Sequence, residues 1–208
     1  MAASTQTSYP DTHTAFFYGT LMARSVLHRV IFGPSASDPN STTLHNLSFA
    51  PAILPNYQRH KVIGADYPAI LEAQQSTVRG TLVRGLTQGD IWRLDLFEGD
   101  EYERRKVSVR ELKPSHKTDL PSLDGDEVLG EVEAETYVWI MGENTLESRE
   151  WDFDEFVREK MWRWVDGEPH AEEMFGELDE AVKQADPTRG RGMNGDITKA
   201  LQDAKSAS

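Results

Sequence analysis

The pattern of apolar and polar positions at the start of the chain predicts a strand, a loop and a helix. The run Ala15-Phe16-Phe17-Tyr18 is typical of a short strand, and it breaks at Gly19, which favours a tight loop. Apolar side chains then recur at helical spacing from Leu21 to Ile31, where Gly33-Pro34 ends the pattern. The polar residues 33–46 predict an exposed loop.

The middle of the chain is expected to be rich in β-structure. Short apolar segments at 49–54, 59–63, 67–71 and 78–84 are separated by Pro, Gly or Asn. Segments of this length and composition are typical of strands. We therefore expect a series of short strands in this region.

A helix follows these strands. Thr87, with Asp90 three positions later, is a helix-start signal, and the apolar face that follows is ended by Gly99. Glu98 is therefore expected at the C-terminal end of this helix.

Two longer strands and a second helix are predicted beyond it. Residues 106–112 and 132–140 alternate between apolar and polar side chains, which indicates strands, and the polar stretch at 113–130 predicts a loop between them. A strongly amphipathic helix starts at Asp152 and reaches Trp164.

The order of these elements indicates an α+β class. Strands and helices do not alternate regularly, so we expect a curled or closed sheet with helices against it and not a doubly wound sheet. A chain of 208 residues suits one core, while residues 166–208 become acidic and then rich in glycine. We interpret this last segment as an acidic, partly helical or disordered tail.

Composition and charge narrow the function classes. Hydrophobic residues make up 38% and charged residues 27% of the chain, which is typical of a folded protein in water. The formal net charge of -13 disfavours partners such as nucleic acid or an anionic membrane surface. No segment is apolar for the about 20 residues of a membrane-spanning helix, and no signal-peptide pattern is present, so a cytoplasmic location is expected.

The sequence lacks the residue patterns typical of metal sites, cysteine chemistry and P-loop nucleotide binding. The absence of cysteine excludes disulfides, thiolate metal sites and a cysteine nucleophile. The six histidines have none of the spacings typical of zinc sites, and no P-loop motif occurs. We therefore expect no metal and no cofactor.

The segment Tyr18-Gly19-Thr20-Leu21 is the first candidate for a binding site. Glycine at a strand end lets successive backbone N–H groups face a ligand, and a following helix favours a carboxylate or an oxyanion. An ordinary glycine turn gives the same pattern and is the commoner explanation on local grounds.

Glu98 is the second candidate. It stands next to Phe97 at the end of an apolar helix face, where partial burial would raise its pKa and let it exchange a proton near neutral pH. A surface glutamate beside a glycine helix end is the competing explanation. A glycosidase-like pair of Glu98 with Asp95 or Glu101 is a further alternative, and sequence spacing alone supports it weakly.

Several motifs, taken in order, resemble those of one enzyme family. They are Phe17–Met22, Tyr67–Ile70, Leu94–Arg104, Ala134–Ile140 and Glu150–Phe156. Together they resemble the gamma-glutamylcyclotransferase-like family, and most of all its branch of avirulence-induced plant proteins and gamma-glutamylamine cyclotransferase. The resemblance covers residues 14–165, which we take as the catalytic domain, with residues 166–208 as the tail.

The resemblance implies a small mixed β-barrel flanked by helices, together with a set of site residues. It assigns the role of general base to Glu98. It assigns substrate binding to Tyr18, Gly19, Thr20, Leu21, Met22 and Tyr102, of which Tyr102 is carried over less directly.

The implied activity is that of a cofactor-independent acyltransferase or lyase. The α-amine of a γ-glutamyl amine, peptide or amino acid closes a ring on the γ-carbonyl and releases an amine with 5-oxoproline. The implied partner is a small molecule, and the oligomeric state is left open. Two alternatives stay open: an enzyme of the same fold that uses Glu98 on another small molecule, and a non-catalytic interaction protein whose acidic tail recruits a partner.

Overall fold

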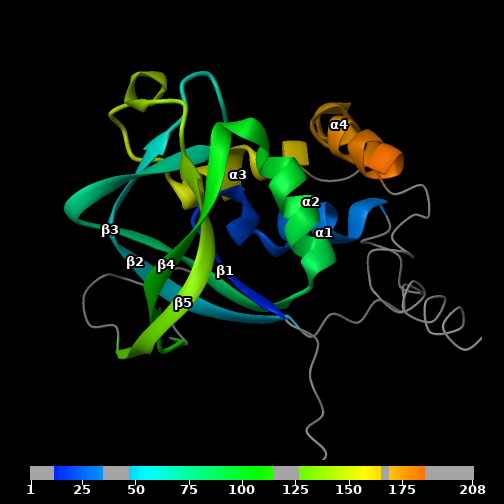
Figure 1. Ribbon diagram of the computed structural model, residues 1–208. Coiled ribbons are helices and arrows are strands. Elements are labelled where there is room, and N and C mark those ends of the chain that lie inside the picture. Colours follow the sequence, from blue (N-terminus) through cyan, green and yellow to red (C-terminus); the bar gives the residue numbers. More distant parts are fainter. Residues whose placement is uncertain (1–11, 35–46, 115–126, 165–168, 186–208) are drawn as a thin grey trace, which may run out of the picture.

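A computed structural model describes residues 12–34, 47–114, 127–164 and 169–185 of the chain (Figure 1). Its strands are β1 (His13–Phe17), β2 (Ser48–Lys61), β3 (Pro68–Leu86), β4 (Tyr102–Leu112) and β5 (Val128–Trp139). Its α-helices are α1 (Arg24–Phe32), α2 (Gln88–Glu98), α3 (Phe153–Glu159) and α4 (Pro169–Ala185). Short 3-10 turns are η1 (Thr20–Met22), η3 (Gly99–Glu101), η4 (Glu143–Thr145) and η5 (Met161–Trp164).

The five strands form one mixed sheet in the order β1-β3-β2-β4-β5. Neighbouring strands in this order pair antiparallel, and a short parallel pairing of Ala15 in β1 with Glu135 in β5 closes the sheet. Figure 1 shows α1, α2 and α4 grouped on one side of this sheet. The predicted α+β class, with a curled sheet and helices against it, is confirmed.

The series of short strands predicted between residues 49 and 84 is wrong. The segments merge into two long strands, β2 and β3, which pair with each other along most of their length. Pro68 begins β3, and Pro55 stands beside a bulge, where Asn56 has a φ of 63°. Strand starts and bulges are positions at which a sheet tolerates proline. Pro51 lies within β2, opposite Thr81 of β3.

Two large clusters of buried side chains form most of the core, beside a small third cluster of Val62, Ala69, Trp139 and Leu146. One cluster consists of side chains from all five strands, which fill the interior of the closed sheet; they include Phe16, Leu54, Ile70, Leu82 and Val109. The other lies between the sheet and the helices and includes Leu27, Leu94, Trp164 and Phe175. This second cluster matters for the site because it fixes α2 against α4.

The predicted helix starts at Thr87 and Asp152 are confirmed, and one helix end is corrected. The first helix, expected from Leu21, begins only at Arg24, because residues 20–22 form the 3-10 turn η1. Thr87 and Asp90 form a reciprocal capping box at the start of α2, which ends at Glu98 as predicted. The helix predicted from Asp152 begins there but ends at Glu159, and a 3-10 turn follows. Trp164 lies at the end of this turn and is buried in the second core cluster.

Helix α4 lies in the segment predicted to be a tail. Its side chains Phe175, Leu178 and Val182 are buried in the second core cluster. Arg29 of α1 holds it through a two-pronged ion pair with Asp179, with N–O distances of 3.1 and 2.7 Å. Part of the segment after residue 165 is therefore packed on the domain. Residues 186–208, most of the loop at 33–46 and residues 115–126 of the second loop lie outside the described residues.

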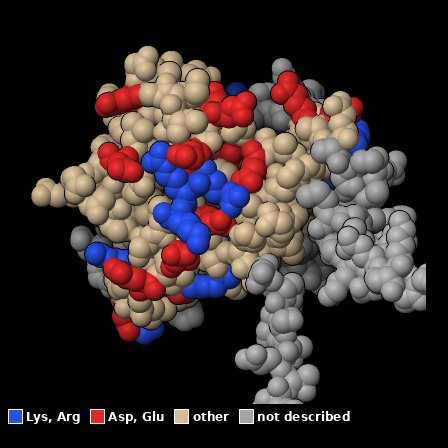
Figure 2. Space-filling view, in the orientation of Figure 1, with Lys and Arg blue, Asp and Glu red and all other residues tan. Residues whose placement is uncertain are grey.

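The outer face of β4 and β5 carries alternating charges. Figure 2 shows positive and negative side chains interleaved over this face. Cross-strand pairs such as Lys106–Glu133, 3.1 Å apart, explain this pattern. No helix within the described ranges combines the length and the apolar character needed to cross a membrane.

Candidate active site

The loop after β1 lines a cavity. Beyond Tyr18 and Gly19 the chain enters η1, where the Met22 N–H donates to the Gly19 carbonyl at 3.0 Å. The first N–H groups of a 3-10 turn have no partner inside the turn, so those of Thr20 and Leu21 remain as donors there. The side chains of Thr20 and Leu21 are buried and anchor the turn.

Two side chains hold this loop in place. The Tyr18 hydroxyl donates to the Tyr137 carbonyl oxygen of β5 at 2.7 Å. The Arg59 guanidinium donates to the Tyr18 carbonyl oxygen at 2.9 Å and lies over the ring of Trp151. Burial, followed by the nearby Glu98, raises the pKa of Tyr18 well above its usual value, so the phenol stays neutral.

Glu98 is positioned by the end of α2. Ile91 and Leu94 are fully buried and fix the helix on the core. Gly99, with a φ of 64°, then reverses the chain, because this conformation favours glycine. The adjacent Phe97 stacks on Phe175 of α4, with ring centroids 6.1 Å apart. The backbone of Glu98 is thus held between a glycine helix end and an aromatic contact.

The surroundings of Glu98 favour its protonated form. Among the described residues, no hydrogen bond or ion pair is found for its carboxyl group. It retains some exposed surface because it lines the cavity, but protein atoms crowd the carboxyl on its other sides. This burial, with a smaller contribution from the negative charge of Asp95, raises the pKa of Glu98 to about 8.

A cavity of about 190 Å³ joins the loop to Glu98. Of the residues predicted for substrate binding and catalysis, Tyr18, Gly19, Thr20, Leu21, Glu98 and Tyr102 line it. Met22 does not; it is partly buried and packs against the second core cluster. The structure therefore brings the Tyr18–Leu21 loop and Glu98 to one cavity, although they are almost 80 residues apart in the sequence. Met22, the last residue of the first motif, is not part of it.

Apart from Glu101, which the sequence offered only as a possible glycosidase-like partner of Glu98, the other lining residues were not singled out as site candidates. They are Phe16, Phe17, Tyr67, Pro68, Leu96, Phe97, Tyr137, Trp164, Glu177 and Leu178. Tyr67 and Tyr137 belong to motifs that carried the family resemblance, so a signal for them was present. Glu177 and Leu178 come from α4, and nothing in their local sequence indicates a site.

The tyrosines of the cavity are engaged in hydrogen bonds. The Tyr102 hydroxyl donates to the Pro68 carbonyl oxygen at 2.9 Å, and the Tyr67 hydroxyl donates to Glu101 at 3.2 Å. Burial raises the pKa of Tyr67 to about 12 and that of Tyr102 far above its usual value. Both phenols therefore stay neutral at physiological pH and act as fixed dipoles beside Glu98.

The titratable lining of the cavity is acidic. Glu98, Glu101 and Glu177 line it, and none of the described lining residues is Lys, Arg or His. Such a lining favours a ligand that brings a positive charge. Within the part of the chain that the structure describes, no three acidic or histidine side chains come together as a metal site would require.

Comparison with known proteins identifies the family. A family model described as "Gamma-glutamyl cyclotransferase, AIG2-like" matches residues 15–153. The chain belongs to this family. "Protein AIG2 C" of Arabidopsis thaliana is 29% identical over 165 residues, which are 79% of this chain and 81% of the relative. "AIG2-like protein D" of the same plant is 32% identical over 144 residues, which are 69% and 78% of the two chains.

A solved structure is also similar. The solution structure of an Arabidopsis thaliana protein is 27% identical, with a TM-score of 0.46, and the alignment covers 88% of each chain.

Membership of the gamma-glutamyl cyclotransferase, AIG2-like family supports an enzyme with a small-molecule substrate. The region that matches the family model contains both the Tyr18–Leu21 loop and Glu98. It ends at the first residue of α3, so η5 and α4 lie beyond it. Trp164, Glu177 and Leu178, which complete the cavity, are thus outside the part that matches the family model.

Proposed function

We propose that the protein is a γ-glutamylcyclotransferase in which Glu98 is the general base. The observation that carries this proposal is a carboxyl with a raised pKa and no protein partner among the described residues, facing the Tyr18–Leu21 loop across one cavity. Membership of a cyclotransferase family supports the same reaction.

The reaction is an intramolecular aminolysis. The α-amine nitrogen of the substrate forms a bond to its own γ-carbonyl carbon, and the bond from that carbon to the leaving nitrogen breaks. The products are 5-oxoproline and an amine, and the proton lost by the attacking nitrogen goes to the leaving nitrogen. Holding the substrate in the ring-closing conformation contributes up to about 7–11 kcal/mol in favourable cases. This chemistry requires no cofactor.

Glu98 is suited to carry that proton. A pKa of about 8 makes it a stronger base than an exposed glutamate, and the approach of a cationic α-ammonium favours its ionised form. The carboxylate then takes a proton from the ammonium, and the carboxylic acid gives it to the leaving nitrogen. The second proton that the attacking nitrogen loses on ring closure leaves with the amine, which is released as its ammonium form. General acid and base catalysis of this kind contributes about 10²–10⁴-fold.

The loop and the acidic lining are suited to the two ends of a γ-glutamyl group. Backbone N–H groups of Thr20 and Leu21 can hold the α-carboxylate or the oxyanion that develops on the γ-carbonyl. The α-ammonium would lie among the carboxyl groups of the cavity. Because the carboxylate is held by backbone donors, the proposal needs no arginine in the cavity.

The interaction-protein alternative needs a sharper test than removal of the tail. Deletion of residues 167–208 would also remove α4, and with it Glu177 and Leu178 from the cavity wall. Such a deletion therefore affects both the tail and the site. Glu98→Gln distinguishes the alternatives better, since an interaction role predicts that the biological effect survives this substitution.

The proposal is tested by product release. The purified full chain is incubated with γ-glutamyl amines, γ-glutamyl dipeptides and glutathione, and 5-oxoproline is quantified by mass spectrometry. Release of 5-oxoproline from at least one compound is the expected result. No release from any of them, with the protein folded, would reject the cyclotransferase assignment and leave the use of Glu98 on another small molecule.

A further inference from the structure

Asp95 connects Glu98 to a network of charged side chains outside the cavity. It lies three residues before Glu98 on α2, about one helical turn away, and it is not among the lining residues. Its Oδ1 accepts hydrogen bonds from the Tyr137 hydroxyl and from Arg104 Nε, both at 2.9 Å. Arg104 Nη2 reaches the other oxygen at 3.4 Å, so the guanidinium clamps the carboxylate with two nitrogens.

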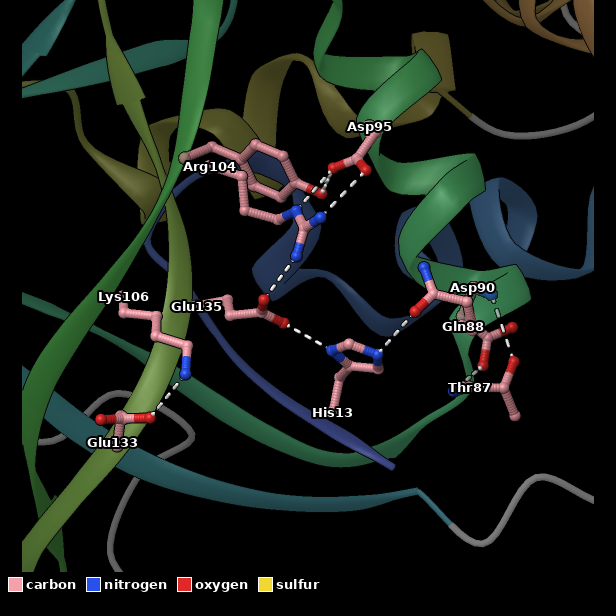
Figure 3. Close-up of polar contacts among 10 residues, drawn as sticks. His13, Thr87, Gln88, Asp90, Asp95, Arg104, Lys106, Glu133 and Glu135 are labelled. Atoms are coloured by element: carbon pink, nitrogen blue, oxygen red, sulfur yellow. Dashed lines mark hydrogen bonds and ion pairs between the residues drawn. The ribbon is translucent and has the colours of Figure 1, made fainter. Parts of the chain in front are cut away.

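The other side of Arg104 is held equally well. Its Nη1 donates to Glu135 of β5, whose second oxygen lies 2.8 Å from His13 Nδ1. His13 Nε2 in turn contacts the side-chain oxygen of Gln88 at 3.1 Å. Figure 3 shows Arg104 between Asp95 and Glu135, with His13 between Glu135 and Gln88. The network leaves α2 at Asp95 and returns to it at Gln88, which fixes Arg104 against the helix.

This network differs from the other ion pairs on the same face. The side chains of Lys106 and Glu133 are 72% and 73% exposed, so water and salt screen their charges. The side chains of Arg104, Glu135 and Asp95 are 30%, 16% and 40% exposed, all well below the Lys106 pair. Charges in the Arg104 network therefore influence nearby groups more strongly than those of the Lys106 pair.

We propose that Asp95 and Arg104 are positioning residues that act on Glu98 with opposite sign. The Asp95 carboxylate favours the protonated form of Glu98, and the clamped guanidinium of Arg104 limits this effect. The inference rests on the proposed function for its catalytic meaning. Asp95 and Arg104 themselves make no contact with the cavity, so neither is a catalytic residue.

The other titratable groups that line the cavity around Glu98 do not supply a positive charge that would offset Asp95. They are Tyr18, Tyr67, Tyr102, Tyr137, Glu101 and Glu177. Burial raises the pKa of each of these tyrosines, so they stay neutral, and the two glutamates add only negative charge. Within the described residues around the cavity, two cations share a neighbour with Glu98: Arg59 through the neutral Tyr18, and Arg104 through the charged Asp95. Only the Asp95 carboxylate acts directly on the proton affinity of Glu98 among these shared neighbours, so Arg104 is the cation placed to offset it.

The test follows the titration of the Glu98 carboxyl in the folded protein. Carbon-13 NMR of glutamate-labelled protein reports this titration, and loss of the signal in Glu98→Gln assigns it. We expect Asp95→Asn to lower the pKa of Glu98 by about 0.5 to 1 unit and Arg104→Gln to raise it by a similar amount. The control Lys106→Gln, which removes an exposed cation on the same strand, leaves the titration unchanged.

A structural role alone predicts a different result. If the network only ties α2 to the sheet, Asp95→Asn and Arg104→Gln shift the titration in the same direction or not at all, and either outcome overturns the inference. Arg104→Lys is the second variant, because lysine keeps the positive charge but cannot contact Asp95 with two nitrogens as the guanidinium does. The pKa of Glu98 in Arg104→Lys is expected to be close to that in the wild type. Comparing it with the pKa of Glu98 in Asp95→Asn therefore tests the proposal even if Arg104→Gln does not fold. A titration of Arg104→Lys shifted as far as that of Asp95→Asn, in the same direction, contradicts the proposal.

The pH dependence of catalysis is expected to shift in the same directions as the pKa of Glu98. The acid limb of the kcat/KM profile should move to lower pH in Asp95→Asn and to higher pH in Arg104→Gln. The NMR titration needs no substrate, so the two proposals fail separately. Opposite NMR shifts without turnover of any γ-glutamyl compound would reject the proposed function and retain the charge balance.

Discussion

Gly19 lies so close to Pro68 that a β-carbon on Gly19 would come within 2.7 Å of the proline Cγ atom and 3.0 Å of Cδ. Pro68 begins β3 and its carbonyl accepts the Tyr102 hydroxyl, so it cannot shift freely. The close approach fixes the Tyr18–Leu21 loop against the wall that carries Tyr102. The loop geometry thus depends on the absence of a side chain at position 19.

Gly19→Ala is expected to displace the loop and to lower kcat/KM for 5-oxoproline release by about 100-fold, since displacements of about 1 Å cost this much in active sites. Gly130→Ala is the matched control, because a β-carbon there meets no atom within 4 Å. Steady-state kinetics measure the effect and thermal unfolding monitors the fold. A Gly19→Ala protein with kcat/KM near the wild-type value would show that the loop does not bind substrate.

Phe175→Ala tests the role of α4. Phe175 is fully buried between Phe97 and Trp164, so its removal is expected to lower the free energy of unfolding by about 3 kcal/mol. It is also expected to raise KM, because α4 carries Glu177 and Leu178 to the cavity. Denaturant titration and kinetics measure the two effects.

Lys183→Ala is the control on the same helix, since Lys183 is exposed and its ion pair with Glu180 is 3.7 Å long. It is expected to change the free energy of unfolding by less than about 0.5 kcal/mol. A loss of stability in Phe175→Ala with an unchanged KM would limit α4 to a structural role.

The features that the sequence could predict are those set by contacts within one element. The position of Glu98 at a helix end follows from Thr87, Asp90 and Gly99, which are local signals within one element. The strand-to-loop junction at Gly19 is local in the same way. These signals suffice to nominate the Tyr18–Leu21 loop and Glu98, although they do not bring the two together.

The features that the sequence did not predict depend on contacts between residues far apart in the chain. The aromatic packing that surrounds Phe97 involves Trp164 and Phe175, which are far along the chain and on elements outside the matched family region. The single long strands β2 and β3 depend on their mutual pairing, which overrides the breaks suggested by proline and glycine. Neither effect has a signature in a short window of sequence.

The raised pKa of Glu98 predicts a pH-dependent cost to stability. Because the folded-state pKa of about 8 lies above the ordinary value of 4.5, protonated Glu98 contributes stability fully below pH 4.5. That contribution is lost as the pH rises toward and through 8. Glu98→Gln removes this dependence, so it should gain stability over the wild type by about 2 kcal/mol between pH 5 and pH 9, after allowance for the partial exposure of Glu98 to the cavity.

Denaturant titrations of both proteins at the two pH values measure this difference, in which other titrating groups cancel. Equal pH dependence of the wild type and Glu98→Gln would mean that the Glu98 carboxyl is solvated like an exposed glutamate. The proposed base would then lack its raised proton affinity.

The role of Glu98 as the proton carrier is the central claim, and the rate of 5-oxoproline release by Glu98→Gln tests it most directly. Glu103→Gln is the control, because Glu103 lies five residues further along and forms an exposed pair with Arg105. We predict that at saturating substrate and pH 8 Glu98→Gln is folded and at least about 100-fold slower than the wild type, while Glu103→Gln is not slowed. A Glu98→Gln protein that releases 5-oxoproline at the wild-type rate would contradict the account.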